Sequence, residues 1–72
     1  MFYQRLEDMR IDFDKTQIQI AEYLNLNREV YRRYEKGMRE IPVWAVIKLA
    51  DLYKTSADYL LSRTNNPKPY GK

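Results

Sequence analysis

Residues 16–37, TQIQIAEYLNLNREVYRRYEKG, contain two short helical patterns separated by a polar turn. Thr16 and Gln19 have the spacing of a capping box, in which each side chain bonds the backbone of the other, so a helix is predicted to begin after Thr16. Ala21 lies on the inward face of this helix, and its small side chain lets a second helix pass close by. The residues expected on that inward face are Ile20, Ala21 and Leu24.

The turn between these patterns has the sequence Asn25-Leu26-Asn27. Asparagine tolerates the left-handed backbone that a tight turn between helices often requires. Asn27 is also a good N-cap for a helix over residues 28–36, and Gly37 is a natural stop after it.

The helix over residues 28–36 separates its side chains by chemistry. At about 100° per residue, its apolar side chains fall on one arc and its charged side chains on the opposite one. The apolar arc holds Val30, Tyr31 and Tyr34, and the charged arc holds Arg28, Glu29, Arg32, Arg33 and Lys36. A solvated outer face would show the same pattern, and Glu29 with Arg33 is a favourable i,i+4 pair. In context, two helices joined by a three-residue turn predict a helix-turn-helix, whose second helix fits the DNA major groove.

The rest of the chain predicts three more helices, over residues 3–13, 42–53 and 56–62. Pro42 suits the first turn of its helix, with Ile41 as a poor N-cap, so packing is expected to hold that end. Ser56 is expected to cap the last helix. The fold class is therefore all-α with five short helices, a domain over residues 1–63 and a flexible tail over residues 64–72.

We expect one hydrophobic core, in which the helix over residues 42–53 turns Val43, Val46, Ile47 and Ala50 inward. The predicted core consists of Leu6, Met9, Phe13, Ile20, Ala21, Leu24, Leu26, Val30, Tyr31, Tyr34, Val46, Ile47, Ala50 and Leu60. Trp44 falls to one side. It is either a shoulder residue packed on a neighbouring helix or part of a self-association surface, since tryptophan is enriched at interface hot spots.

Composition narrows the classes of function. The 72 residues carry a net charge of +3 and include neither cysteine nor histidine, which removes disulfides, thiolate metal sites and the commonest general base. Neither a signal peptide nor a membrane helix is predicted, and a cytoplasmic protein is expected. Residues 1–24 hold three basic and five acidic side chains, whereas residues 25–40 hold five basic and three acidic ones. This asymmetry suits an anionic partner.

At residues 16–37 the sequence resembles the phage Cro and repressor type of helix-turn-helix regulators, also called the xenobiotic-response-element type. The residues that carry the resemblance are Thr16, Gln17, Ile20, Ala21, Leu24, Leu26, Asn27, Tyr31, Tyr34, Glu35 and Gly37. Downstream, REIPVWAVIKLADLYKTSADYLLSRT is similar to the closing helices of Gram-positive bacterial members, so the resemblance covers residues 3–64. The chain departs from the family at Asn25, Lys54 and Ser62, where glycine is usual, and at Lys15, where an apolar residue is usual.

The resemblance implies a lambda-repressor-like fold and a set of roles on DNA. Gln17 would bind a phosphate, and Lys36 and Arg39 would lie along the DNA backbone. Glu35 would hold the loop after the third helix. The residues expected to face bases or nearby phosphates are Asn27, Arg28, Glu29 and Arg33. Arg32 is either a phosphate contact or a solvated flank. Arginine can grip guanine O6 and N7, and glutamate can accept a hydrogen bond from cytosine N4.

The leading hypothesis is a sequence-specific regulator of transcription, a repressor, that binds double-stranded DNA as a homodimer, at least on DNA. The alternative is an antitoxin-like or adaptor module whose ligand is another protein, for which Ile18, Trp44 and Leu52 could form an apolar patch. An enzyme is not expected, and neither a cofactor, a metal nor a small-molecule effector is predicted.

Overall fold

The computed structural model describes residues 2–66 and contains five helices in that part of the chain. They are α1 (Gln4–Asp12), α2 (Gln17–Tyr23), α3 (Arg28–Glu35), α4 (Val43–Tyr53) and α5 (Ala57–Leu60). None of residues 2–66 forms a strand, which confirms the all-α prediction. Within the same range no helix has the length and apolar character needed to cross a membrane.

Local capping sets the start of several helices where the sequence predicted it. Thr16 Oγ1 accepts a hydrogen bond from the Gln19 amide at 3.1 Å, and Gln19 Oε1 accepts one from the Thr16 amide at 2.8 Å. Asn27 caps α3 and Ser56 caps α5 through the same kind of contact. These side chains satisfy backbone donors that a helix start leaves free. The prediction that Ile41 caps α4 is wrong, because Pro42 takes that position and Ile41 is buried in the core.

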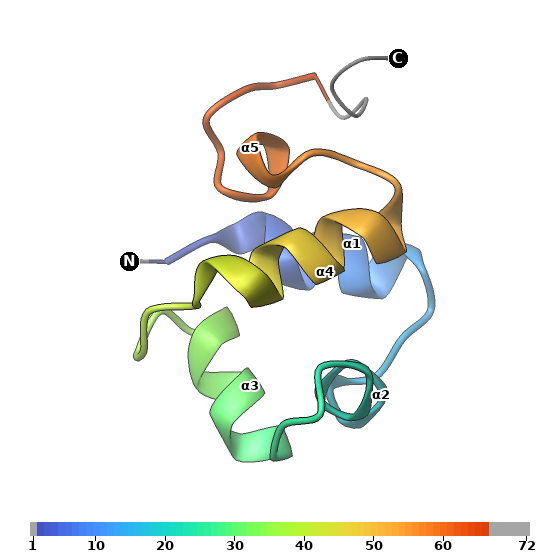
Figure 1. The fold of residues 1–72 in the computed structure, drawn as a ribbon, viewed down its shortest axis with the longest axis vertical. Coiled ribbons are helices and arrows are strands. Elements are labelled where there is room, and N and C mark those ends of the chain that lie inside the picture. Colours follow the sequence, from blue (N-terminus) through green and yellow to red (C-terminus); the bar gives the residue numbers. More distant parts are fainter. Residues whose placement is uncertain (1, 67–72) are drawn as a thin grey trace.

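The helices enclose one core, with α4 across the middle of the view, α5 above it and α2 and α3 below it (Figure 1). α1 packs against both α3 and α5. Nine of the residues predicted for the core are buried: Leu6, Ile20, Ala21, Leu24, Tyr31, Tyr34, Val46, Ala50 and Leu60. Three more, Met9, Leu26 and Val30, are partly buried against them.

The predicted inward face of α4 is correct for Val46 and Ala50 and wrong for Val43 and Ile47. Val43 is 73 % exposed and Ile47 is 50 % exposed. The residues that α4 buries are Ala45, Val46, Leu49, Ala50 and Tyr53. Apolar residues surround most of this helix, so periodicity alone did not fix its phase. Phe13 is also outside the core at 40 % exposure, and its ring packs on Tyr53 with the ring centroids 5.1 Å apart.

The segment after α5 is tied to α1 by Arg5. Its guanidinium donates to the backbone oxygens of Tyr59 at 2.9 Å and Thr64 at 2.6 Å, and to Asn65 Oδ1 at 2.8 Å. It also lies 4.1 Å from the centroid of the Tyr59 ring. The predicted tail over residues 64–72 therefore begins with residues that Arg5 holds, and its residues 67–72 lie outside the described part of the chain.

Three positions where the family usually has glycine keep a left-handed backbone here without it. Asn25, Lys54 and Ser62 have φ values of 59°, 54° and 61°. Gly37 has a φ of 73°, and a Cβ there would lie 2.9 Å from the Phe2 Cα, so the position requires glycine. Of these residues, Lys54 is the least suited to the left-handed conformation. Its side chain cannot form the short local hydrogen bonds that stabilise asparagine there.

We predict that Lys54→Gly stabilises the domain. A non-glycine residue in the left-handed region costs about 1–2 kcal/mol, and the greater freedom of glycine in the unfolded chain offsets part of the gain. The free energy of unfolding should therefore rise by up to about 1 kcal/mol. Lys48→Gly, the same change at a right-handed position of α4, should lower it by about 1 kcal/mol. Urea denaturation of both variants checks this, and equal losses in the two would contradict it.

Candidate nucleic-acid interface

α2 and α3 form a tight helix-turn-helix at one end of the molecule, the lower part of Figure 1. The left-handed Asn25 reverses the chain, and the Leu26 amide donates to the Ala21 carbonyl at 2.8 Å. Ala21 is only 2 % exposed, so its small side chain lies between the packed helices as the sequence predicted. The apolar face of α3 packs on the domain and its charged face points outward.

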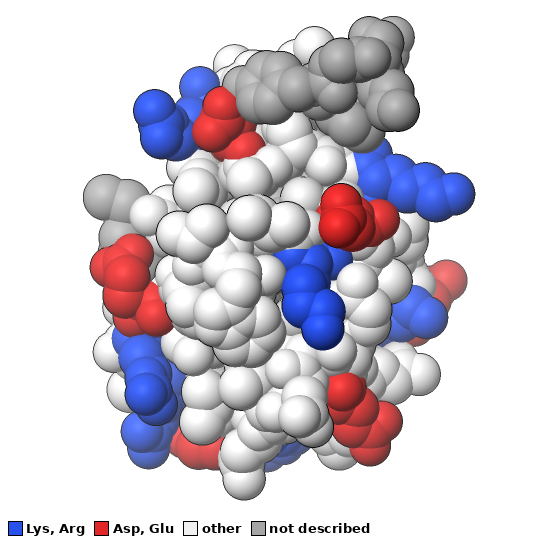
Figure 2. All heavy atoms as spheres, viewed as in Figure 1, with Lys and Arg blue, Asp and Glu red and all other residues white. Residues whose placement is uncertain are grey.

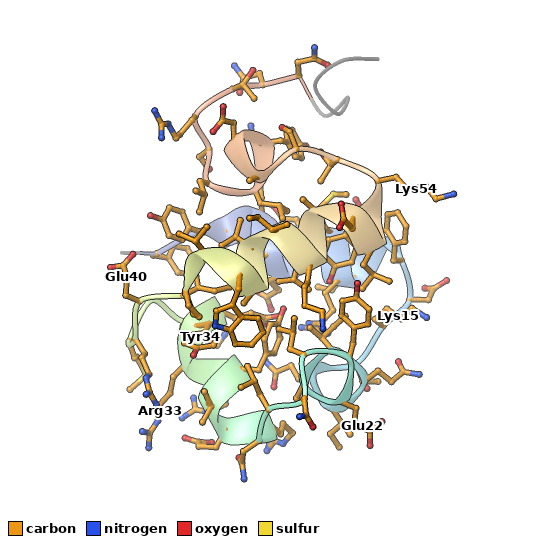
Figure 3. The ribbon with its side chains drawn as sticks, in the orientation of Figure 1. Lys15, Glu22, Arg33, Tyr34, Glu40 and Lys54 are labelled. Atoms are coloured by element: carbon orange, nitrogen blue, oxygen red, sulfur yellow. The ribbon has the colours of Figure 1, made fainter. Side chains whose placement is uncertain are left out.

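The residues predicted to contact DNA lie on or beside this outward face. Asn27, Arg28, Arg33, Lys36 and Arg39 are exposed, and Gln17, Glu29 and Arg32 are half-buried. Arg33 extends from the side of α3 that faces away from the core in Figure 3. In the space-filling view basic side chains gather in the same region, at the lower left beside α3 (Figure 2). These residues thus run along α3 from its N-cap to the loop that follows it, with Gln17 at the start of α2.

Glu29, the acidic residue on this face, forms ion pairs with two arginines. Glu29 Oε2 lies 2.6 Å from Arg32 NH2 and 3.3 Å from Arg33 Nε, and Glu29 Oε1 lies 3.0 Å from Arg32 Nε. The hydrogen bonds from Arg32 are the largest cause that lowers the pKa of Glu29 to about 2. Glu29 is therefore anionic at neutral pH, with both carboxylate oxygens hydrogen-bonded to arginine.

A buried ion pair lies behind α3, between Arg10 of α1 and Glu35 at the end of α3. Arg10 Nε donates to Glu35 Oε2 at 2.6 Å, and the Glu35 side chain is fully buried. The hydrogen bond with Glu35 raises the pKa of Arg10. Glu35 thus joins α3 to α1, whereas the resemblance had implied that it holds the loop after α3. The sequence did contain a signal for this pair, because Arg10 stands among the inward positions of the first helix.

Gln17 connects the buried pair to the outward face. Its Nε2 donates to Glu35 Oε1 at 3.0 Å, and its Oε1 accepts from Arg28 NH1 at 3.4 Å. A chain of polar contacts therefore runs from Arg10 in α1 to Arg28 in the first turn of α3. It holds the start of α2 and the start of α3 in a fixed relation. This surface, basic and anchored from behind, is suited to bind an anionic backbone.

Nothing in residues 2–66 groups histidine, cysteine, aspartate and glutamate side chains in a way that could hold a metal ion.

A family model described as helix-turn-helix matches residues 6–60. The chain belongs to this helix-turn-helix family. The match includes every element from α2 to α5 and the residues that form the buried pair, so the family's lambda-repressor-like helical fold is confirmed for this chain.

Several proteins with curated names are similar to this helix-turn-helix chain. It is 35 % identical to the HTH-type transcriptional regulator YobD of Bacillus subtilis over 96 % of this chain and 62 % of that protein. It is 35 % identical to the HTH-type transcriptional regulator ImmR of the same organism, over 83 % of this chain and 47 % of that protein. The CTXphi transcriptional repressor RstR of Vibrio cholerae is 31 % identical over 86 % of this chain and 56 % of its own length. The chain thus spans about half to three fifths of these relatives, and no solved structure matches it.

We predict that the Arg10–Glu35 pair is essential for stability in this helix-turn-helix domain. Arg10→Met or Glu35→Gln leaves one partner buried and uncompensated, and each should lower the free energy of unfolding by about 3–5 kcal/mol. The double variant should lose much less than the sum, because it leaves no unpaired charge. Asp8→Asn, an exposed change on α1, should cost less than about 0.5 kcal/mol. Denaturant unfolding of the set tests this, and additive losses would show that the two side chains act independently.

Proposed function

We propose that this chain regulates transcription, as a repressor, by binding a specific double-stranded DNA sequence with α3 in the major groove. The single observation that carries the proposal is the outward face of α3, which begins with the exposed Arg28 and continues through the exposed Arg33 to Lys36 and Arg39. A helix of this kind fits the major groove and reads base edges with its N-terminal residues. The names of YobD and ImmR as transcriptional regulators and of RstR as a repressor support the same function.

The geometry favours different roles for the residues at the two ends of α3. Arg28 is in the first turn, exposed and contacted by Gln17, so it is the candidate for base contacts. Gln17 Nε2 uses one N–H for Glu35 and keeps a second for a phosphate. The Oδ1 of Asn27 caps α3, which leaves its amide hydrogens free to donate. Lys36 and Arg39 lie at and beyond the other end of α3, where the DNA backbone would pass.

We also propose that the protein reads DNA as a homodimer in the bacterial cytoplasm, on the nucleoid. Two-fold symmetric readers need a surface that sets the spacing of their half-sites. α4 offers one, because Val43, Trp44 and Ile47 are exposed apolar residues on its outer face. An uncharged surface lies left of the centre of Figure 2, over the first part of α4 in Figure 1, with a basic and an acidic side chain beside it. Occupying an operator is sufficient for repression, so we propose no catalytic activity.

The same exposed residues of α4 are the observation that favours the second candidate, a protein-interaction module. A patch of large apolar side chains on a small domain often marks a protein contact. In that case the partner would be a different protein, such as a toxin, and DNA binding would be secondary. Preference for a DNA sequence at moderate salt distinguishes the two functions.

We predict different effects for Arg28→Ala and Lys36→Ala on DNA affinity. A base contact carries discrimination, so Arg28→Ala should cost roughly 1–3 kcal/mol on a duplex selected from a random pool and much less on a scrambled one. A phosphate contact is sequence-independent, so Lys36→Ala should weaken both duplexes equally and reduce the salt slope by about one unit. Salt titrations of both variants provide the test. Equal losses on both duplexes for Arg28→Ala would make Arg28 a phosphate clamp, and no preference by the unmutated protein would favour the protein-partner function.

We predict that Trp44→Ala weakens self-association. Trp44 is 47 % exposed between Val43 and Ile47, and truncating a tryptophan anchor commonly costs an interface more than 2 kcal/mol. Sedimentation velocity with and without operator DNA measures the change. Ile11→Ala, which removes an exposed apolar side chain from α1, is the matched control and should leave the oligomer unchanged. An identical oligomer for Trp44→Ala in both conditions would exclude Trp44 from the interface.

A further inference from the structure

The contacts of Glu29 divide the arginines of α3 into two kinds. Arg32 presents Nε and NH2 to the carboxylate, at 3.0 and 2.6 Å, so the forked edge of its guanidinium faces Glu29. Arg33 presents only Nε, at 3.3 Å. The forked edge, like the edge formed by the two terminal nitrogens, can bind a carboxylate or a phosphate with two hydrogen bonds. Arg32 uses it within the protein, whereas Arg33 donates to Glu29 through one nitrogen only.

What each arginine retains follows from its donors. A guanidinium has five N–H groups, and Arg33 keeps all four on NH1 and NH2, the terminal pair that can bind guanine O6 and N7 together. Its Nε contact with Glu29 restrains the stem, so the free terminal pair points away from the helix. Figure 3 shows Arg33 extended in this way, away from the body of the domain. Arg32 also keeps N–H groups on NH1 and NH2, but two hydrogen bonds hold it to Glu29 where one holds Arg33.

The charge on this face leads to the same conclusion. Glu29 is the one acid among the outward residues of α3, because the other acid of this helix, Glu35, is buried against Arg10. An arginine without a partner would bind any phosphate and add equally to specific and non-specific affinity. Sharing a carboxylate partly neutralises the positive charge of an arginine, so its attraction to a phosphate is weaker even though its remaining N–H groups can still donate. Exposed pairs of this kind are individually weak, so their effect is a factor of several in affinity.

We propose that Glu29 is a positioning residue that sets the sequence specificity of DNA binding by neutralising Arg32 and by aiming the terminal nitrogens of Arg33 at base edges. This inference rests on the proposed function. It differs from the role in which Glu29 itself accepts a hydrogen bond from cytosine, because Oε2 already accepts from both arginines and only Oε1, with one bond from Arg32, keeps a lone pair. The low pKa of Glu29, about 2, agrees with a carboxylate that stays ionised between the two cations.

The test is Glu29→Gln, with affinities measured across a range of salt for the selected and the scrambled duplex. Freeing Arg32 should raise affinity for the scrambled duplex by about three- to fivefold and steepen its salt slope by about one unit. Affinity for the selected duplex should rise less or fall, because Arg33 loses its restraint. The ratio of specific to non-specific affinity therefore decreases.

Two variants separate this effect from a general change in charge. Glu22→Gln removes an equal charge from an exposed residue of α2 that lies on the other side of the helix-turn-helix from Arg33 in Figure 3, and it should leave the ratio unchanged. In an Arg32→Gln background, Glu29→Gln should no longer steepen the salt slope for the scrambled duplex. Circular dichroism verifies that each variant keeps its helices, as expected for changes outside the core.

Three outcomes would overturn the inference. If Glu29→Gln lowers affinity only for duplexes with cytosine at one position, Glu29 reads that base directly. If Glu22→Gln has the same effect as Glu29→Gln, the cause is net charge and not the contacts with arginine. If the unmutated protein prefers no duplex, the proposed function itself fails, and that result is visible before any variant is made.

Discussion

The buried pair of Arg10 and Glu35 is the constraint on which the rest of the structure depends. Removing two charges from water is expensive, and the cost is recovered only when the geometry is good and the remaining donors and acceptors are satisfied. Here Glu35 accepts from Arg10 and Gln17, and Arg10 also donates to the Lys15 carbonyl at 2.9 Å. Burial raises the pKa of the neighbouring Tyr31, which therefore stays neutral beside the pair. The pair therefore ties the C-terminal end of α3 to α1.

That placement determines what α3 can present to a partner. Because Glu35 holds the C-terminal end of α3 and Gln17 reaches from the same carboxylate to Arg28, both ends of the helix are positioned from one buried point. Apolar packing by Tyr31 and Tyr34 fills the space between these ends. A recognition helix has to be rigid to discriminate between bases, since a tilting helix would exchange base contacts for phosphate contacts. The polar network adds to the contacts that hold α3 in place against α1 and α2.

The sequence predicted the parts of this design that are local. The caps at Thr16, Asn27 and Ser56 act within three residues, and the structure confirms each of them. The outward arc of α3 was also predictable, because polar and apolar residues separate cleanly around that helix. α4 is different: Val43, Trp44 and Ile47 make its pattern apolar on nearly every side, so only contacts with other elements decide which side is buried. Glu35 required knowledge of which residue lies opposite Arg10, and that is a property of the tertiary structure.

The charges of α3 are organised in two layers, and this explains the mixture of acids and bases in its sequence. On the inner side Glu35 compensates a cation from another helix, which fixes the position of α3. On the outer side Glu29 compensates cations of its own helix; the sequence predicted the contact with Arg33, and the structure adds the shorter one to Arg32 at 2.6 Å. A helix whose basic residues were all unpaired would bind any phosphate, whereas one whose basic residues were all paired would bind none. With Arg28 and Lys36 exposed and Arg32 paired, α3 lies between these limits, which is the arrangement that the proposed sequence-specific binding requires.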